Sequence, residues 1–312
     1  MITSITSSRA IQDFLFHCQY EKNLAEKTLS AYRNDLGQFQ SFLLESSFSG
    51  AVVDIGKLLL RAYLKQVSEI SKPKTVKRKF ATLKAFFNFL ELDDQIVVSP
   101  FRKMQIKIVL DQRLPVVMTL AEVKRLFEYL YEQLELIETK STARTKLLIR
   151  DIAILEMLFA TGMRVAELAH LTCKDVDLES GSVLIFGKGR KERSLPLCNS
   201  KVLKSLTYYL QTVQESRRTD RFFLGRDGMG ITEQTVRILV EKHTKKAGLS
   251  KKITPHTFRH TVATLLLENG VGIRNIQKIL GHSSITTTEI YAKVNPEAQR
   301  VLIGQFHPRE MF

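Results

Sequence analysis

The sequence predicts a mainly α-helical protein of two domains, with a small antiparallel β-sheet in the second domain. Its 312 residues suffice for two domains of ordinary size, each with its own core. Along most of the chain, apolar residues recur at spacings of three and four, which is typical of amphipathic helices. One stretch, residues 182–197, is instead rich in strand-forming residues on both sides of a turn with two glycines.

Residues 1–95 are predicted to form an all-helical domain. The helical spacing runs through "AIQDFLFHCQYE", "TLSAYRNDLGQFQSFLLE" and "TVKRKFATLKAFFNFLEL". In the last segment, Lys77, Arg78, Lys79 and Lys84 stand among apolar residues, so one face of the helix can pack while another presents cations. These cations either contact a polyanion or merely keep that face solvated.

Residues 96–118 are predicted to link the two domains, because Pro100 and Pro115 interrupt the helical spacing there. The second domain, residues 119–312, begins with a helix-start signal. Thr119 can cap the helix, and a glutamate follows three residues later, at the spacing of a capping box.

The second domain is predicted to be helical with a small sheet at one side. Residues 152–160 are mostly apolar and end at Gly162, which is typical of a buried helix closed by a glycine. In residues 182–197, "SVLIF" and "ERSLPL" flank "GKGRK", which predicts a β-hairpin. Helical spacing then returns.

The charge of the chain favours a polyanionic partner. Lys and Arg number 47 against 32 Asp and Glu, a net charge of +15, and both halves of the chain are basic. This distribution suits two domains that both touch phosphates better than it suits a basic tail. Charge alone leaves ribosomal, regulatory and enzymatic proteins open.

A membrane or secreted location is not predicted. No run approaches the roughly 18 apolar residues of a membrane span, and the N-terminal segment lacks the features of a signal peptide. The three cysteines, Cys18, Cys173 and Cys198, are far apart and suggest neither a disulfide framework nor a zinc site. We therefore expect a cytoplasmic protein without a structural zinc site.

The segment "TPHTFRHTVATLLLENG", residues 254–270, predicts a helix with a cationic first turn. Thr254 can cap it, and His256 and Arg259 then lie on one face near its N-terminus, which already favours anions. Arg can grip a phosphate with two parallel hydrogen bonds. Alone, such a pair is more often structural. A metal site at His256 and His260 lacks the carboxylate that comparable motifs carry.

Other segments place further polar residues at element boundaries. Arg164 in "ATGMRVAEL" follows a glycine-containing turn after the apolar helix, and Lys188 in "GKGRKER" stands between two glycines at the expected hairpin tip. His282 in "ILGHSSITTTEIY" follows a glycine that can end a helix, and Tyr291 comes nine residues later.

In this order, R…K…HxxR…GH…Y, these residues resemble the tyrosine site-specific recombinases, also called the phage integrase family. The resemblance spans roughly residues 119–295, through the four fragments "ATGMRVAEL", "GKGRKER", "HTFRHTVATLLLENG" and "IQKILGHSSITTTEIY". Residues 10–90 resemble, less specifically, the helical SAM-like core-binding domain that precedes the catalytic domain in that family. The resemblance implies this two-domain architecture.

The resemblance implies that Tyr291 is the nucleophile, which attacks a DNA phosphodiester and leaves a 3′-phosphotyrosyl link and a free 5′-hydroxyl. Lys188 would protonate the leaving 5′-oxygen. The reaction needs no cofactor and no external energy source. The enzyme is thus expected to be a metal-independent DNA strand transferase.

The other four implied catalytic residues act on the phosphate. Arg164 and Arg259 would hold its two non-bridging oxygens, where charge develops. His256 and His282 would hydrogen-bond the phosphate and help to move the proton of the tyrosine. We expect His260 to have a packing or supporting role.

The resemblance covers compact recombinases of the Xer type and the small integrases of plasmids and other mobile elements. The role can therefore be integration and excision, or the resolution of plasmid or chromosome multimers. Residues 129–151 are longer and more charged than the corresponding turn of Xer proteins, which weakens an Xer assignment. The alternatives are DNA relaxation like that of type IB topoisomerases and a DNA-binding regulator that does not cut.

The expected partner is double-stranded DNA with an inverted-repeat recombination site. Candidate contacts to its backbone are Lys77, Arg78, Lys84 and Arg237. The active assembly is expected to be a homotetramer, or a heterotetramer with a related recombinase, with possible accessory proteins, on DNA in the cytoplasmic nucleoid. The C-terminal tail has an apolar cluster, Val301, Leu302, Ile303 and Phe306, that is expected to dock on a neighbouring protomer or on its own domain.

Overall fold

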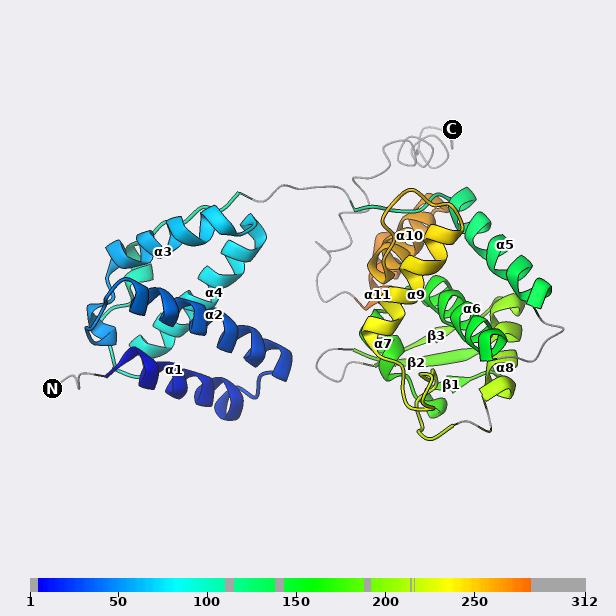
Figure 1. Cartoon of the computed structure of the whole chain (residues 1–312), viewed down its shortest axis with the longest axis horizontal. Helices are drawn as coiled ribbons and strands as arrows, with labels where there is room; N and C mark the ends of the chain where they lie inside the picture. Colours follow the sequence, from blue (N-terminus) through cyan, green and yellow to red (C-terminus); the bar gives the residue numbers. More distant parts are fainter. Residues whose placement is uncertain are drawn as a thin grey trace, which may run out of the picture. The chain divides into compact units, whose positions relative to one another are not determined.

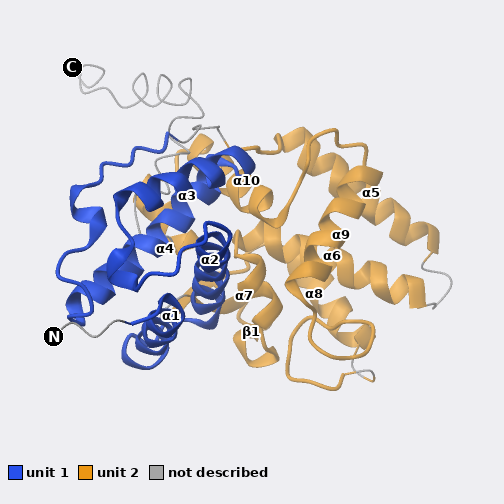
Figure 2. Cartoon of the chain, turned by 60° about the vertical axis from the view of Figure 1, so that its left-hand side comes forward, with its two compact units in different colours: residues 1–112 blue, residues 113–312 orange. Residues whose placement is uncertain are grey.

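The chain forms two compact units in this computed structural model, residues 1–112 and residues 113–312 (Figure 2). The structure describes residues 5–109, 115–137, 143–187, 192–213, 215 and 217–281. These residues are mostly helical, and a single three-stranded antiparallel sheet lies in the described part of unit 2 (Figure 1). The predicted fold class, mainly α with a small antiparallel sheet, is therefore confirmed.

Unit 1 is built from helices around an aromatic core. The helices are α1 (Ser7–Phe16), α2 (Glu26–Glu45), α3 (Lys57–Ile70) and α4 (Pro73–Leu92), joined by a π-helical turn η1 (His17–Glu21) and the 3₁₀ turns η2 (Val52–Asp54) and η3 (Pro100–Lys103). The ring centroids of Phe14 in α1 and Phe86 in α4 are 5.6 Å apart, and those of Phe39 in α2 and Tyr63 in α3 are 5.0 Å apart. Buried aromatic rings thus connect all four helices.

The first part of the segment that we predicted as a linker, residues 96–118, packs on unit 1. Ile96 and Phe101 are buried in its core. The ring centroid of Phe101 is 5.9 Å from that of Phe87 on α4. The segment lacks helical spacing because a short 3₁₀ turn, and not a longer helix, brings Phe101 to the core.

Unit 2 is arranged around one central helix. Its helices are α5 (Leu120–Ile137), α6 (Ala143–Thr161), α7 (Val165–His170), α8 (Ser200–Val213), α9 (Glu233–Lys246), α10 (Pro255–Glu268) and α11 (Ile273–Leu280), with a 3₁₀ turn η4 (Cys173–Asp175). Helix α6 is buried along most of its length and packs against α5, α8, α9 and α10. Its mostly apolar run, residues 152–160, explains this central position because a helix that is apolar on most sides must be covered on most sides.

The sheet of unit 2 contains the predicted hairpin. Its order is β1 (Val176–Asp177), β2 (Ser182–Phe186) and β3 (Glu192–Pro196), all antiparallel. Leu184 of β2 pairs with Ser194 of β3, and the side chains of Val183, Ile185 and Leu195 are buried against the unit. The hairpin tip, residues 188–191, lies outside the described residues.

Local signals position the helix starts of unit 2. At α5, Thr119 N–H donates to the Glu122 carboxylate over 2.8 Å and Glu122 N–H donates to Thr119 Oγ1 over 3.2 Å, the predicted capping box.

None of the helices in the described ranges is long and apolar enough to cross a membrane.

Candidate active site

Arg164 is held at the junction between α6 and α7. Gly162, with φ of +58°, turns the chain after α6, and Arg164 becomes the N-cap residue of α7. Its side chain donates to Glu167 Oε1 over 2.7 Å and to the carbonyl oxygen of Gly281 over 3.0 Å. The guanidinium is partly exposed, with 37% of the side chain accessible, so it can still reach a ligand.

Arg259 and His256 lie in the first turns of α10. Thr254 caps this helix by accepting from Thr257 N–H over 3.2 Å. Arg259 is buried, and it donates to the carbonyl oxygens of Gly162 over 2.9 Å and Leu280 over 2.6 Å. His256 is exposed at the N-terminal end of the same helix. The α6–α7 turn, the start of α10 and the end of α11 therefore meet at one place.

A third arginine, Arg193 of β3, supports the same place. Its Nε donates to the carbonyl oxygen of Ile279 over 3.0 Å, and its two terminal nitrogens donate to the Glu167 carboxylate over 2.7 and 3.1 Å. Gly281, which ends α11 with φ of +65°, lies so close that an added Cβ would meet Arg193 Nη1 at 2.8 Å. The end of α11, directly before His282, is thus fixed by three arginines.

Glu167 joins two of these arginines. Burial by itself raises the pKa of this carboxyl group, but the hydrogen bond from Arg193 and the contacts with Arg164 outweigh burial and hold the pKa below its usual value. Glu167 therefore stays ionised and fixes both guanidinium groups.

The electrostatic environment of His256 is strongly positive. Partial burial of the ring lowers its pKa, and the charges of Arg259, Arg237 and Arg164 lower it further, while Glu233 acts in the opposite direction. At neutral pH the ring is therefore neutral and can accept a proton. A cationic cluster of this kind favours an anion in front of it.

The structure brings together three of the six residues that we predicted as catalytic: Arg164, His256 and Arg259. The other three, Lys188, His282 and Tyr291, lie outside the described residues. In the parts of the chain that the structure describes, no group of three His, Cys, Asp or Glu side chains could hold a metal ion.

Glu167 and Arg193 were not predicted from the sequence as functional residues. Glu167 could have been found from its position three residues after Arg164, where it can reach back to the start of α7. Arg193 carries no such local signal, because its contacts are with residues far away in the sequence.

We expect Arg193→Gln to lower the rate of DNA cleavage by about tenfold to a hundredfold, because a loosened α11 end misplaces the adjoining catalytic groups. DNA affinity should stay close to that of the wild-type protein. Cleavage rates and equilibrium binding, measured separately, check this. Arg125→Gln is the matched control, since Arg125 also donates to a main-chain carbonyl of unit 2, that of Gly248 over 3.1 Å. Equal losses in both variants would contradict the positioning role.

The predicted DNA contacts of unit 1 lie on one exposed face of α4. Lys77, Arg78 and Lys84 are exposed, and the sequence separation of seven brings Lys77 and Lys84 to the same side of the helix. Lys79, which we expected among the exposed cations, is instead buried. Arg78 also pairs with the buried carboxylate of Asp35 on α2. In unit 2, Arg237 pairs with Glu233 one turn earlier on α9 and contributes to the positive potential at His256.

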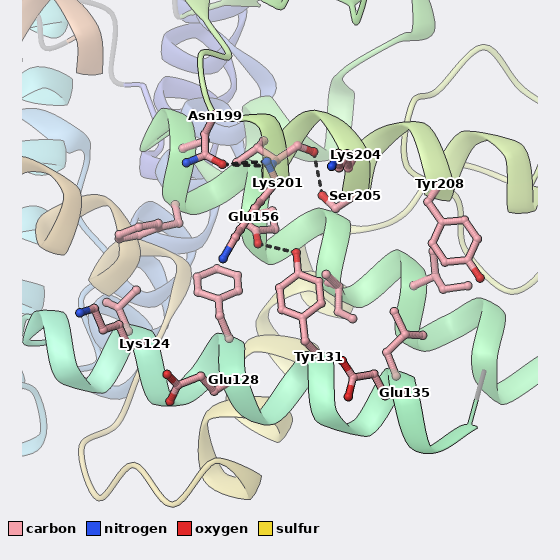
Figure 3. Close-up of a pocket in the computed structure, with 18 of the residues that line it drawn as sticks. Lys124, Glu128, Tyr131, Glu135, Glu156, Asn199, Lys201, Lys204, Ser205 and Tyr208 are labelled. Carbon is pink, nitrogen blue, oxygen red and sulfur yellow. Dashed lines mark hydrogen bonds between the residues drawn. The ribbon is translucent and has the colours of Figure 1, made fainter. Parts of the chain in front are cut away.

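A large cavity of unit 2 lies apart from these residues. It has a volume of about 1200 Å³ between α5, α6 and α8, and Figure 3 shows its mostly apolar wall. In its wall, Tyr131 donates from its hydroxyl to Glu156 Oε1 over 2.7 Å. Burial raises the pKa of Glu156, although the Tyr131 hydrogen bond and the charge of Lys201 oppose this.

We expect Glu156→Gln to stabilise unit 2 at pH 8 by on the order of 1 kcal/mol, which corresponds to a few degrees in melting temperature. A raised carboxyl pKa means that the folded state holds the proton more tightly. Stability therefore falls as the pH rises from the unfolded-state pKa through the raised one. The glutamine keeps the acceptor for Tyr131 and removes the charge. Thermal melts should show a smaller gain in melting temperature at pH 5 than at pH 8. A loss of stability at pH 8 would mean that the attraction between Glu156 and Lys201 dominates.

Comparison with families of known proteins gives two matches along the chain. A model described as the phage integrase family matches residues 117–298, and one described as the N-terminal SAM-like domain of phage integrase matches residues 11–93. A tyrosine recombinase of Agathobacter rectalis is 40% identical over 304 residues, 97% of each chain. The tyrosine recombinase XerD of Staphylococcus aureus is 34% identical over 303 residues, 96% of this chain and 98% of that protein.

Solved structures with the same fold include DNA complexes. The XerH site-specific recombinase bound to a palindromic difH substrate, in a post-cleavage complex, aligns with a TM-score of 0.72 and 22% identity over 98% of this chain and 90% of that one. A lambda integrase tetramer bound to a Holliday junction aligns with a TM-score of 0.70 and 18% identity over 93% and 78%. At these identities the likeness concerns the fold.

Proposed function

This chain belongs to the phage integrase family of tyrosine recombinases, and from that premise we propose that it recombines specific double-stranded DNA sites through a 3′-phosphotyrosyl intermediate. Both halves of the chain match the family, and the relatives named above are similar along nearly their whole length. The net charge of +15 supports DNA as the substrate.

The proposed reaction is a phosphoryl transfer between two oxygens. The phenolic oxygen of Tyr291 attacks the scissile phosphorus, a new tyrosyl O–P bond forms, and the bond to the 5′-oxygen breaks. The proton leaves Tyr291 for a neighbouring base, and Lys188 gives a proton to the departing 5′-oxygen. Attack by another 5′-hydroxyl reverses these steps and joins the new strand, so no external energy source is consumed.

The observation that carries this proposal is the convergence of Arg164 and Arg259. They come from the N-cap of α7 and from α10, yet they donate to the adjacent carbonyl oxygens of Gly281 and Leu280. Two guanidinium groups fixed side by side match the two non-bridging oxygens of one phosphate, where negative charge develops. Because protein carbonyls already hold them, little reorganisation is needed during the reaction.

The proposed roles of the remaining groups follow from their surroundings. The lowered pKa of His256 keeps its ring neutral at physiological pH, so it can take part in accepting the tyrosine proton. His282 follows the fixed end of α11, and we assign it a hydrogen bond to the same phosphate. Lys77, Arg78, Lys84 and Arg237 are proposed to contact the DNA backbone.

Two other functions use similar residues. A type IB topoisomerase would relax supercoiled DNA without a defined site, and a regulator would bind a site without cutting. The family match disfavours both. We place the enzyme in the cytoplasm. Its proposed biological role is either the integration and excision of a mobile element or the resolution of DNA multimers.

We propose that four protomers assemble on two DNA sites, either as copies of this chain or with a related recombinase. Deleting residues 299–312, which contain the apolar cluster of the tail, is expected to weaken cooperative assembly on DNA by about tenfold, because buried apolar contacts between protomers are lost. Binding of a single protomer to a half-site is the control and should not change. Unaltered cooperativity in a gel-shift titration would count against docking on a neighbour.

The proposed function is tested with plasmids that carry paired fragments from the genetic neighbourhood of the gene. Recombination between two copies of one fragment, with a defined crossover point, is the expected result. Relaxation of plasmids that lack these fragments would favour the topoisomerase activity. A footprint without nicking on any fragment would favour the regulator.

A further inference from the structure

A smaller cavity of unit 2, about 500 Å³ in volume, lies between α5, α6 and α9. Its wall combines cations from three separate segments: Arg144 of α6, Arg226 of the loop before α9, and Lys242 and Lys246 of α9. No acidic side chain is among the described residues that line it. We call it the α9 cavity.

Most of these cations have no compensating charge among the residues that the structure describes. Lys242 lies 3.6 Å from the carboxylate of Asp151. Arg144, Arg226 and Lys246 form no ion pair with any described carboxylate. Like charges that converge on one cavity repel each other, and a bound anion removes this cost.

The wall also contains a buried histidine, His243. His243 is 3% exposed, and its Nε2 lies 2.8 Å from Asp151 Oδ2. Its Nδ1 is buried without a hydrogen-bond partner among the residues that the structure describes. Buried polar atoms rarely remain unpaired, so the described residues leave this nitrogen without the partner that such an atom usually has.

The α9 cavity is separate from the active site. Arg237, which acts on His256, and Lys246 are nine residues apart on α9. At about 3.6 residues per turn, nine residues are two and a half turns, which puts the two side chains on opposite faces of the helix. The cations of the cavity therefore do not serve the scissile phosphate.

We propose that the α9 cavity binds a small phosphorylated ligand through a di- or triphosphate group. Arg144 and Arg226 offer planar forks for phosphate oxygens, and the two lysines add charge. The volume exceeds the need of one phosphate and falls within the roughly 300–1,000 Å³ of small-molecule sites. Tyr129, Ile137 and Leu147 supply an apolar wall on which a nucleotide base can lie. Nucleotides and inorganic polyphosphates share the recognised group.

The test measures binding of ATP, pyrophosphate and adenosine to the full chain by calorimetry, in a solution that contains neither DNA nor magnesium. ATP and pyrophosphate should bind with dissociation constants of about 1 mM or lower, and adenosine more weakly. Tighter binding of ATP than of pyrophosphate identifies a nucleotide as the source, and equal binding identifies any polyphosphate. Absence of saturable binding of both ATP and pyrophosphate overturns the proposal.

Variants on one helix separate this site from general charge attraction. Arg144→Gln combined with Lys246→Gln should weaken ATP binding by about tenfold or more. Lys245→Gln, next to Lys246 but paired with Glu241 and outside the cavity, should change it less than about twofold. Equal effects of both changes overturn the proposal. The proposal is also overturned if the double variant loses as much affinity for duplex DNA as it loses for ATP, because the cations would then be contacts to DNA.

A second measurement needs no variant. Saturating ATP should protect Lys246 from acetylation in the wild-type protein and leave Lys245 reactive, as read by mass spectrometry. Equal reactivity of Lys246 with and without ATP overturns the proposal even if the double variant fails to fold.

Discussion

A Tyr291→Phe variant is expected to bind DNA with nearly the affinity of the wild-type protein and to form no covalent link with it. The phenylalanine keeps the aromatic ring but removes the hydroxyl that we propose as the nucleophile. The rate of strand cleavage should fall by at least about 10⁴-fold, because loss of the nucleophile leaves only the binding contributions of the site. A phosphate held by Arg164 and Arg259 does not need the hydroxyl to remain bound.

The measurement traps cleaved DNA on a nicked substrate, from which the freed end diffuses away so that religation is prevented. A denaturing gel then separates protein-linked DNA from free DNA. Tyr208→Phe is the matched control, since it removes a hydroxyl from α8, in another part of unit 2, and should leave trapping unchanged. A covalent product that persists in Tyr291→Phe would show that another residue is the nucleophile.

The architecture of the chain could be predicted in detail where the sequence signal is local. The capping box of Thr119 and Glu122 and the hairpin of β2 and β3 depend on residues close in sequence, and both are present. The burial of Phe101 could not be predicted in this way. Its ring packs on Phe87 of α4, and this contact leaves no periodic trace in the intervening segment.

The residues of the candidate site also divide into those that a sequence pattern predicts and those that it does not. Arg164, His256 and Arg259 were found through a sequence pattern. The structure brings Arg164 and Arg259 to the turn that ends α11, and both charges act on His256. Arg193 was not found, because its partners are Glu167 and a main-chain carbonyl 86 residues away. Every residue type has the same main-chain carbonyl oxygen. A hydrogen bond to that oxygen therefore does not require a particular residue type that could be recognised in the sequence.

Arg259→Lys is expected to lower strand cleavage by about 10²- to 10³-fold, the loss typical of removing one donor that stabilises transition-state charge. Lysine keeps the positive charge but has no planar fork, so it cannot serve the carbonyls of Gly162 and Leu280 and a phosphate oxygen together. Leaving one of these buried carbonyls unpaired also costs about 1–3 kcal/mol of folding stability. Single-turnover cleavage and thermal melting measure the two effects separately.

Arg150→Lys distinguishes the catalytic loss from the structural one. Arg150 is also buried in unit 2, where it pairs with Asp151 and donates to the carbonyl oxygen of Leu224 over 3.3 Å. Its replacement should therefore lower the melting temperature without slowing cleavage by the folded protein. Cleavage that falls in step with stability in both variants would mean that Arg259 only supports the α11 end. A loss confined to Arg259→Lys would mean that its guanidinium acts at the phosphate and not only through the stability of unit 2, since both variants remove a buried guanidinium from that unit.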